Sequence, residues 1–300
     1  MAAETNLITT AQMKKAREID FTQRFTHQSL NKLIEVLGVT RRIPMMEGTT
    51  LYFYRTTGTL QSGTVAEGDV IPLSQYKAEK IAVGEIGLKK WRKAVSAEAI
   101  KKSGYEAAVG DTDNALLRDV QTGIRADLFT FLGKAYASSD VINGAAYTTA
   151  TGEGLQAALA DAWGQLQVKF EDDTAEAVYF VNPLDVSAYL GTANISTQTA
   201  FGMSYIENFL GLGTVILSSR ITQGTFVATA KENLIMYYLT MGGDVATAFS
   251  LTTDETGYIG INSGYQNNER AQIESLVMSG IQFLVEYAEG VVKGKITSTP

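Results

Sequence analysis

The sequence predicts an α+β fold, in which a long β-hairpin and a long amphipathic helix accompany a mixed α/β core. Residues 49–59 and 76–91 form two strand-like runs on either side of a glycine-rich stretch. Residues 112–137 carry apolar side chains at three- and four-residue steps, which is typical of a helix with one buried face. After residue 154, short strands alternate with helices, which is typical of an α/β core.

The composition is that of a globular protein. The 300 residues are 45% hydrophobic and 19% charged, which permits one large domain or two smaller ones. The net charge is −7 and the pI is about 4.9. An acidic chain repels nucleic acid phosphates, so we expect no tight binding of nucleic acid, although the chain could enclose it.

The chain contains no cysteine, which excludes disulfides, thiolate zinc sites and cysteine nucleophiles. This absence fits a reducing cytoplasm. Residues 1–10 have no basic start followed by an apolar core, so we expect no secretory signal. The apolar run 234–241 is far shorter than the roughly 20 residues of a membrane-spanning helix, so it indicates a buried strand.

Residues 1–37 are interpreted as an N-terminal arm, with a helix expected at 29–37 and a stop at Gly38. The polar first part of the arm could order only against a partner, or could be a frayed terminus. Residues 38–140 are assigned to a hairpin, called the extended loop (48–93), and to the long helix.

The two strands of the hairpin are expected at 49–59 and 76–91, joined by residues 58–74, which offer little that could pack. A long hairpin alone is marginally stable, so it must lie on its own chain or on a neighbour. The return strand is basic, which suggests either a nucleic-acid patch or, in better agreement with the acidic whole, a solvated or partner-facing strand. Its bases are Lys77, Lys80, Lys89, Lys90, Arg92 and Lys93, against the acids Glu79 and Glu85.

Ser96 is expected to open a short helix at 97–102, and Thr112 or Asp113 to cap a longer one that ends near Ala137. One apolar stripe follows the longer helix, which predicts packing against a sheet. The stripe consists of Leu116, Val120, Ile124, Leu128, Phe131, Leu132 and Ala135.

Residues 141–241 are assigned to a separate α/β domain. A small-residue linker is expected at 144–154. Residues 170–219 contain six acids and no base, so the acidic charge of the chain is concentrated there. Helices are predicted at 155–168 and 183–190, with a loosely helical segment at 201–209. Strands are predicted at 177–181, 214–217, 225–230 and 234–239.

Residues 242–300 are predicted to return as strands at 245–252, 273–278, 281–287 and 291–296. We expect these strands to pack against the long helix. The second domain would then be discontinuous, built from roughly residues 38–140 and 242–300.

No pattern of residues predicts an active site. The only histidine, His27, has no nucleophile motif near it, and Gly211-Leu212-Gly213 lacks the spacing of a dinucleotide-binding loop. Two further groups resemble partial metal sites, but a solvated turn and a helix cap explain them better. They are Asp172 with Asp173, and Asp111 with Asp113 and Asn114. We therefore expect no catalytic, cofactor-binding or metal-binding residues, and a protein that is not an enzyme.

The order of elements resembles the tailed-phage major capsid proteins of the Hong Kong 97-like fold. Three stretches carry the resemblance: EKIAVGEIGLKKWRKAVSAEAIKKSGY, DNALLRDVQTGIRADLFTFL and AVYFVNPLDVSAYLG, with FGMSYIENFLGLGTVILSSRITQGTFVATAKENLIMYYL as the remainder of the α/β domain. By this resemblance the hairpin is the extended loop, the long helix is the spine of the peripheral domain, and the α/β part is the axial domain.

The resemblance implies a virion protein whose copies form hexamers and pentamers of an icosahedral shell around double-stranded DNA. It further implies assembly in the bacterial host cytoplasm, with a portal and a separate scaffolding protein, and no membrane. The alternatives are an encapsulin, a nanocompartment shell protein of the same fold, and a soluble α/β enzyme.

Overall fold

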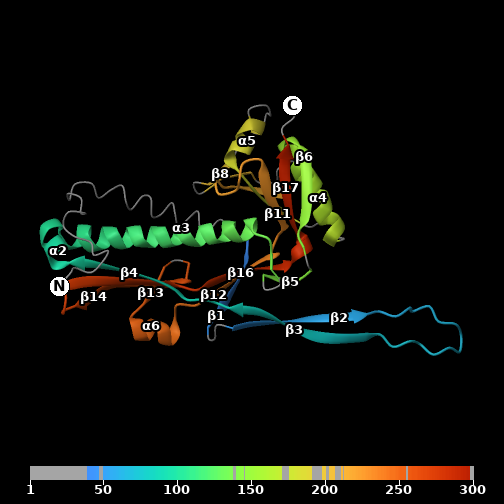
Figure 1. The fold of residues 1–300 in the computed structure, drawn as a ribbon, viewed down its shortest axis with the longest axis horizontal. Helices are drawn as coiled ribbons and strands as arrows, with labels where there is room; N and C mark the ends of the chain where they lie inside the picture. The colour runs from blue at the N-terminus through green and yellow to red at the C-terminus, as the bar shows by residue number, and fades with distance from the viewer. Residues whose placement is uncertain are drawn as a thin grey trace.

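The computed structural model describes residues 39–46, 50–137, 140–144, 146–170, 176–190, 198–200, 203–206, 211, 213–254 and 256–297. The expected arm at 1–37, with its helix at 29–37, lies outside these residues. Figure 1 shows three parts: an upright sheet with two helices, a long horizontal helix above flat strands, and a hairpin that projects sideways.

The upright part is a seven-stranded sheet in the order β6-β17-β11-β7-β10-β9-β8. Its strands are β6 (Thr148–Glu153), β7 (Ala177–Val181), β8 (Gln198–Ala200), β9 (Met203–Ile206), β10 (Gly213–Leu217), β11 (Thr225–Ala230) and β17 (Val291–Thr297). Helices α4 (Gly154–Phe170) and α5 (Pro183–Leu190) cover one face, where Leu159 packs with Tyr179 and Phe226. The predictions for both helices and for the strands β7, β10 and β11 are confirmed.

Helix α3 (Asp111–Gly133) is the long horizontal helix, and its predicted stripe is confirmed from Leu116 to Leu132, whereas Ala135 lies beyond the helix and is exposed. Val120, Ile124 and Leu128 are buried in the largest core cluster. That cluster includes Val178 and Phe180 from the other face of the seven-stranded sheet, because successive strand residues point to opposite sides. The helix therefore joins the upright sheet to the flat strands.

Two four-stranded sheets complete the body, in the orders β13-β14-β15-β4 and β1-β12-β16-β5. The first contains β4 (Lys89–Ser96), β13 (Thr252–Thr253), β14 (Ile259–Asn267) and β15 (Gln272–Ser279). The second contains β1 (Arg41–Met45), β5 (Val141–Asn143), β12 (Leu234–Leu239) and β16 (Ile281–Tyr287). The predicted strands β12, β15 and β16 are confirmed, whereas β1 and β14 were not predicted.

Three short helical elements lie between the longer ones: α2 (Ala97–Ser103) leads from β4 towards α3, α6 (Gly243–Phe249) joins β12 to β13, and the 3-10 turn Ala288–Gly290 joins β16 to β17. Helix α2 starts as predicted, because the Ser96 hydroxyl accepts a hydrogen bond from the Ala99 amide at 3.3 Å.

The predicted cap of the long helix is wrong. Helix α3 continues without a break from a π-helical turn, Glu106–Gly110, so its first amide groups find partners in that turn. Thr112 donates its hydroxyl to the Ala108 carbonyl, and Asp113 pairs with Lys93. The helix also ends earlier than Ala137, because Lys134 is already extended.

Three other local predictions are wrong. The expected linker at 144–154 contains strand β6, which pairs in parallel with β17. Part of the loosely helical segment at 201–209 is strand β9, which pairs with β10. The strand expected at 245–252 is mostly helix α6, which begins after Gly242 and ends at Ser250 in the left-handed conformation.

The C-terminal strands pack against the long helix as expected, but they do so from three different sheets. Val277 of β15, Phe283 of β16 and Val291 of β17 belong to the same core cluster as Val120 of α3. Strand β15 lies in the sheet below α3, β16 lies in the second four-stranded sheet, and β17 lies between β6 and β11 in the upright sheet. The chain thus returns through all three sheets, and its last strand belongs with residues from the predicted α/β domain.

Candidate assembly interface

The hairpin of β2 (Thr50–Thr59) and β3 (Gln75–Glu85) projects from the body (Figure 1). Ten residue pairs join its strands, from Thr50 opposite Glu85 to Thr59 opposite Gln75, with one bulge after Leu51. The predicted hairpin is confirmed, but its return strand is shorter than expected. Residues 89–93 belong to β4, which pairs with β15 in another sheet, and Lys89 and Lys93 reach acids on α3.

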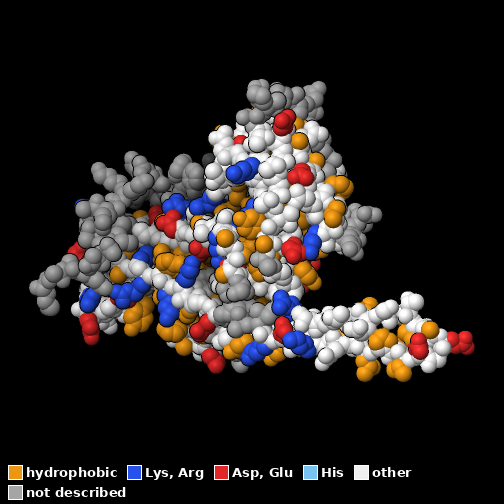
Figure 2. Space-filling model, turned by 45° about the vertical axis from the view of Figure 1, so that its right-hand side comes forward, with side chains coloured by type: hydrophobic (Ala, Val, Ile, Leu, Met, Phe, Trp, Pro, Cys, Tyr) orange, Lys and Arg blue, Asp and Glu red, His pale blue; other side chains and the backbone are white. Residues whose placement is uncertain are grey.

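Among the described residues, the contacts that anchor the hairpin to the body lie at its base. Leu51 and Ile86 are buried with Ile235 and Leu284 of the second four-stranded sheet. The Phe53 ring meets the ring of Tyr237 edge-on, with 5.6 Å between the ring centroids. Beyond these contacts the two strands extend past the body, as Figure 2 shows.

The two faces of the projecting strands differ in chemistry. Tyr52, Tyr54 and Tyr76 are exposed on one face, where the Lys80 ammonium lies 3.5 Å from the centroid of the Tyr52 ring. The other face carries Arg55, Glu79 and Lys77. Glu79 pairs with Lys77 at 2.8 Å and with Arg55 at 3.5 Å. The hydrogen bond from Lys77 is the main cause that lowers the pKa of Glu79.

The tip of the hairpin, residues 60–74, presents apolar side chains to solvent. Val70 is 91% exposed and Leu73 is 92% exposed, and Leu60 and Ile71 are exposed as well. Exposed apolar side chains that cluster on a projecting element mark an interaction surface. These four residues were not predicted from the sequence as a surface, although large apolar residues within a glycine-rich stretch were a visible signal.

The basic residues of the expected return strand are largely paired within the chain. Lys89 meets Asp127 of α3 at 2.5 Å, and Lys93 meets Asp113 at 2.8 Å. Lys93 is nearly buried, and this burial lowers its pKa although Asp113 acts in the opposite direction. Lys89 and Lys93 therefore hold β4 against α3, and the bases of the expected return strand do not form the continuous basic strip that the sequence suggested.

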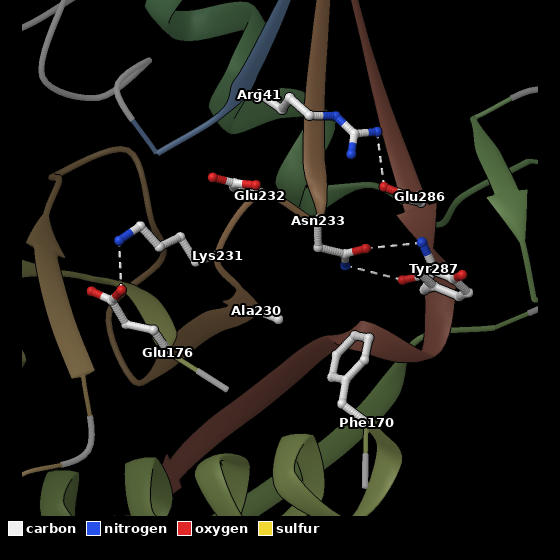
Figure 3. Close-up of a pocket in the computed structure, with 9 residues that line it drawn as sticks. All are labelled: Arg41, Phe170, Glu176, Ala230, Lys231, Glu232, Asn233, Glu286 and Tyr287. Carbon is white, nitrogen blue, oxygen red and sulfur yellow. Dashed lines mark hydrogen bonds and ion pairs between the residues drawn. The ribbon is translucent and has the colours of Figure 1, made fainter. Parts of the chain in front are cut away.

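A cavity of about 310 Å³ lies where β1, β12 and β16 meet the turn between β11 and β12 (Figure 3). Two ion pairs lie at its edge: Arg41 with Glu286 at 2.9 Å, and Lys231 with Glu176 at 2.6 Å. The Asn233 side chain bonds to the backbone of Tyr287 at 2.9 and 3.1 Å. These contacts link neighbouring strands. Among the described residues that line the cavity, no reactive side chains converge on one point.

The other residues weighed as chemical candidates gain no such role. His27, Asp172 and Asp173 lie outside the described residues, while Asp111 and Asp113 lie in the first turn of α3. Gly213 has a positive φ of 136°, and a Cβ there would come within 2.1 Å of the Ala177 carbonyl oxygen. The glycine is therefore needed where β10 approaches β7.

Within the described ranges, no group of three or more histidine, aspartate or glutamate side chains lies where it could hold a metal ion. In the same ranges, no helix is both long enough and apolar enough to cross a membrane.

Comparison with solved structures identifies proteins that have a similar fold. A chain from Mycobacterium phage Patience superimposes with a TM-score of 0.61 at 10% identity, over 100% of this chain and 95% of that one. The mature capsid of bacteriophage PhiM1 gives 0.58 at 10% identity, over 88% and 87%. The SrpI encapsulin complex from Synechococcus elongatus gives 0.52 at 10% identity, over 98% and 91%.

No family model and no curated protein sequence matches the chain. The class that the fold defines is nevertheless clear, because the likeness extends over nearly the whole of each chain. The protein has an α+β capsid fold, and the resemblance to phage capsid proteins is confirmed at the level of the fold.

Proposed function

We propose that this chain is the major capsid protein of a tailed bacteriophage. Its copies assemble into hexamers and pentamers of an icosahedral shell that encloses double-stranded DNA. The observation that carries the proposal is the projecting hairpin on a capsid fold. Its apolar tip is uncovered in the single chain, and an assembly would provide the missing cover.

The parts of the molecule take the roles of the Hong Kong 97-like fold. Residues 1–37 are the arm, residues 38–140 contain the extended loop and the spine helix, residues 141–241 form the axial domain, and residues 242–300 return to the peripheral domain. One change follows from the sheet order: β17 belongs with the axial sheet, between β6 and β11. The axial sheet then faces the centre of each hexamer or pentamer.

The proposed partners are other copies of this chain, a portal and a separate scaffolding protein. The shell forms in the cytoplasm of the bacterial host, and the protein then resides in the virion. The shell encloses DNA without sequence-specific binding. The net charge of −7 on each chain repels the DNA phosphates.

Light scattering on the purified protein over a range of concentrations tests the proposal. We expect masses that are large multiples of 32.4 kDa, from rings or from closed shells. A single species near 32.4 kDa at every concentration, with and without a scaffolding partner, would contradict the proposal.

An encapsulin-type nanocompartment is the second candidate, because the encapsulin of Synechococcus elongatus shares the fold. The contents of particles from the natural source separate the two functions. Nuclease-protected double-stranded DNA supports the phage capsid, whereas a single enclosed enzyme supports the nanocompartment. A soluble α/β enzyme is disfavoured, since the described residues contain no converging reactive groups.

A further inference from the structure

A small group of polar side chains is buried where α3 meets the turn between β13 and β14, among the strands below the long helix in Figure 1. Gln121 of α3 is 1% exposed, and Tyr258, which precedes β14, is also 1% exposed. Tyr258 belongs to the same core cluster as Val120 and Ile124 of α3. The turn therefore packs against the middle of the long helix.

One oxygen of the Asp254 carboxyl group is fully occupied within this turn. Its Oδ1 accepts hydrogen bonds from the Thr256 amide at 3.2 Å, the Thr256 hydroxyl at 2.5 Å and the Gly257 amide at 3.2 Å. The Asp254 amide also donates to the Ile259 carbonyl at 3.1 Å. These bonds fix the orientation of the carboxyl group, so the position of Oδ2 is fixed as well.

The remaining polar atoms of the group have no hydrogen-bond partner among the described residues. They are Oδ2 of Asp254, both polar atoms of the Gln121 amide and the Tyr258 hydroxyl, and all are buried. An unpaired buried polar atom destabilises a fold, so each of them requires an explanation. No hydrogen bond of normal length joins Gln121 to Asp254, although the amide is close enough to act on the charge of the carboxyl group.

Burial raises the pKa of Asp254 above its usual value. The hydrogen bonds from Thr256 and the neighbouring Gln121 amide lower this pKa, but they do not compensate for burial. The charged carboxylate is thus disfavoured at this position, whereas a neutral carboxyl group has an O–H that can donate a hydrogen bond. The Gln121 amide oxygen is an acceptor that lacks such a donor.

We propose that Asp254 and Gln121 form a proton-dependent contact that holds the turn between β13 and β14 on α3. When a proton from solvent binds Oδ2 of Asp254, the new hydroxyl donates to the amide oxygen of Gln121, and no charge is buried. When this proton is lost, a negative charge remains on a buried oxygen, and the turn separates more readily from the helix. The contact lies within one copy of the chain, so the inference goes beyond the proposed shell function and does not depend on it.

The direction of the pH dependence follows from the raised pKa. The contact is complete below the ordinary carboxyl pKa of 3.8, and it is lost as the pH rises through the higher pKa of the folded protein. The other ionisable side chains that face the cluster are Tyr258, Tyr238 and Arg42. Tyrosine and arginine keep their charge state between about pH 4 and 7, so of these groups only Asp254 titrates in this window.

Hydrogen exchange followed by mass spectrometry between about pH 4 and 7 tests the contact, after correction for the chemical exchange rate at each pH. We expect peptides that cover residues 252–260 of the wild type to lose protection as the pH rises. Peptides from β7 and β11 of the upright sheet should keep theirs, which separates opening of the turn from global unfolding. Light scattering checks that the state of association is the same at each pH.

Two matched variants identify the group that titrates. Asp254→Asn has the shape of the protonated acid and donates from its amide, so its turn should stay protected across the whole range. Glu255→Gln removes the acid next to it in the sequence and should behave as the wild type. Chemical denaturation gives a second readout: the denaturation midpoint of Asp254→Asn, minus that of the wild type, should rise with pH over the same window.

A double-mutant cycle tests whether the two side chains meet. Gln121→Glu places a second carboxyl group beside Asp254, and two adjacent carboxylates repel, so stability should fall more steeply as the pH rises. In the Asp254→Asn background, the same substitution should have a smaller effect on this slope. Equal effects in both backgrounds would show that the side chains do not interact.

Constant protection of residues 252–260 in the wild type would overturn the proposal, because the carboxyl group would then keep one protonation state throughout. Protection that rises with pH would overturn it as well, since the ionised form would then be the one that holds the turn. Loss of protection in both the wild type and Asp254→Asn would assign the change to another group and would contradict the role of Asp254.

Discussion

Val120 lies in the middle of the buried stripe of α3 and is only 3% exposed. Val120→Asp would place an unpaired charge between α3 and the core, so we expect the free energy of unfolding to fall by about 3 to 5 kcal/mol. Chemical denaturation measures this change. Asp119→Ala, at the exposed neighbouring position, should shift stability by no more than about 0.5 kcal/mol. A Val120→Asp variant as stable as the wild type would show that this face is not buried.

Lys293 of β17 is half-buried beside the end of α3. Its ammonium lies 4.5 Å from the centroids of the Tyr136 and Tyr147 rings and donates to the Lys134 carbonyl. Burial, together with the nearby charge of Lys134, lowers the pKa of Lys293 to about 8. Its charged form is therefore disfavoured in the folded protein.

This lowered pKa predicts a pH dependence of stability. Between about pH 8 and the ordinary lysine pKa of 10.5, the unfolded chain binds the proton that the folded chain has lost, so stability rises with pH. We expect the free energy of unfolding of the wild type, minus that of Lys293→Met, to increase across this window. A difference that stays constant with pH would contradict the assigned pKa.

Sequence reasoning at single positions succeeded where burial alone decided the outcome. The stripe from Val120 to Leu132 follows from helical spacing and the preference of apolar groups for the core. The role of Lys93 was not predictable, because its partner Asp113 lies twenty positions away and reaches it only after β4 and α3 pack together.

Among the elements, the hairpin of β2 and β3 is central to the proposed assembly. Replacing residues 61–73 by Asn-Gly should leave a folded monomer, because its buried anchors Leu51 and Ile86 lie at the base. The same change removes Val70, Ile71 and Leu73, so we expect loss of rings and shells in microscopy and light scattering. A shortened variant that assembles as well as the wild type would make the hairpin an ordinary intramolecular element.

Limited proteolysis tests the role of the same hairpin without removing any residue from it. The tip of the free subunit has few internal bonds, such as that from the Gln61 amide to the Ser74 hydroxyl at 3.0 Å. We expect the first cuts in the free subunit within residues 58–75 and protection of that segment in assembled particles. Equal resistance in both states would contradict a covered tip.

Element predictions from the sequence succeeded for strands of continuous apolar residues and for long periodic helices, such as β7, β12 and α4. They failed where local composition was ambiguous. The segment at α6 contains valine, threonine and phenylalanine, which favour strands, but it belongs to none of the sheets, and it begins at the glycine pair Gly242 and Gly243. The boundary between β3 and β4 was not predicted, because bases occur on both sides of it. The chain leaves the hairpin there and pairs with β15 of another sheet.

At the scale of the whole molecule, the order of hairpin, long helix and α/β part was predictable, because each element has its own periodicity. The pairing of β17 with β6 and β11 was not, since long-range strand order leaves no local signature. The candidate interface was predicted in its location, but its chemistry was not: the tip is apolar and acidic, and the bases expected to make the contact are mostly paired within the chain.

Negative-stain electron microscopy of the purified protein shows directly whether copies of this chain form a shell. We expect closed shells of uniform diameter, or rings of five and six copies where closure needs a scaffolding partner. Fields of separate small particles at every concentration, matching the mass of one 32.4 kDa chain, would contradict it.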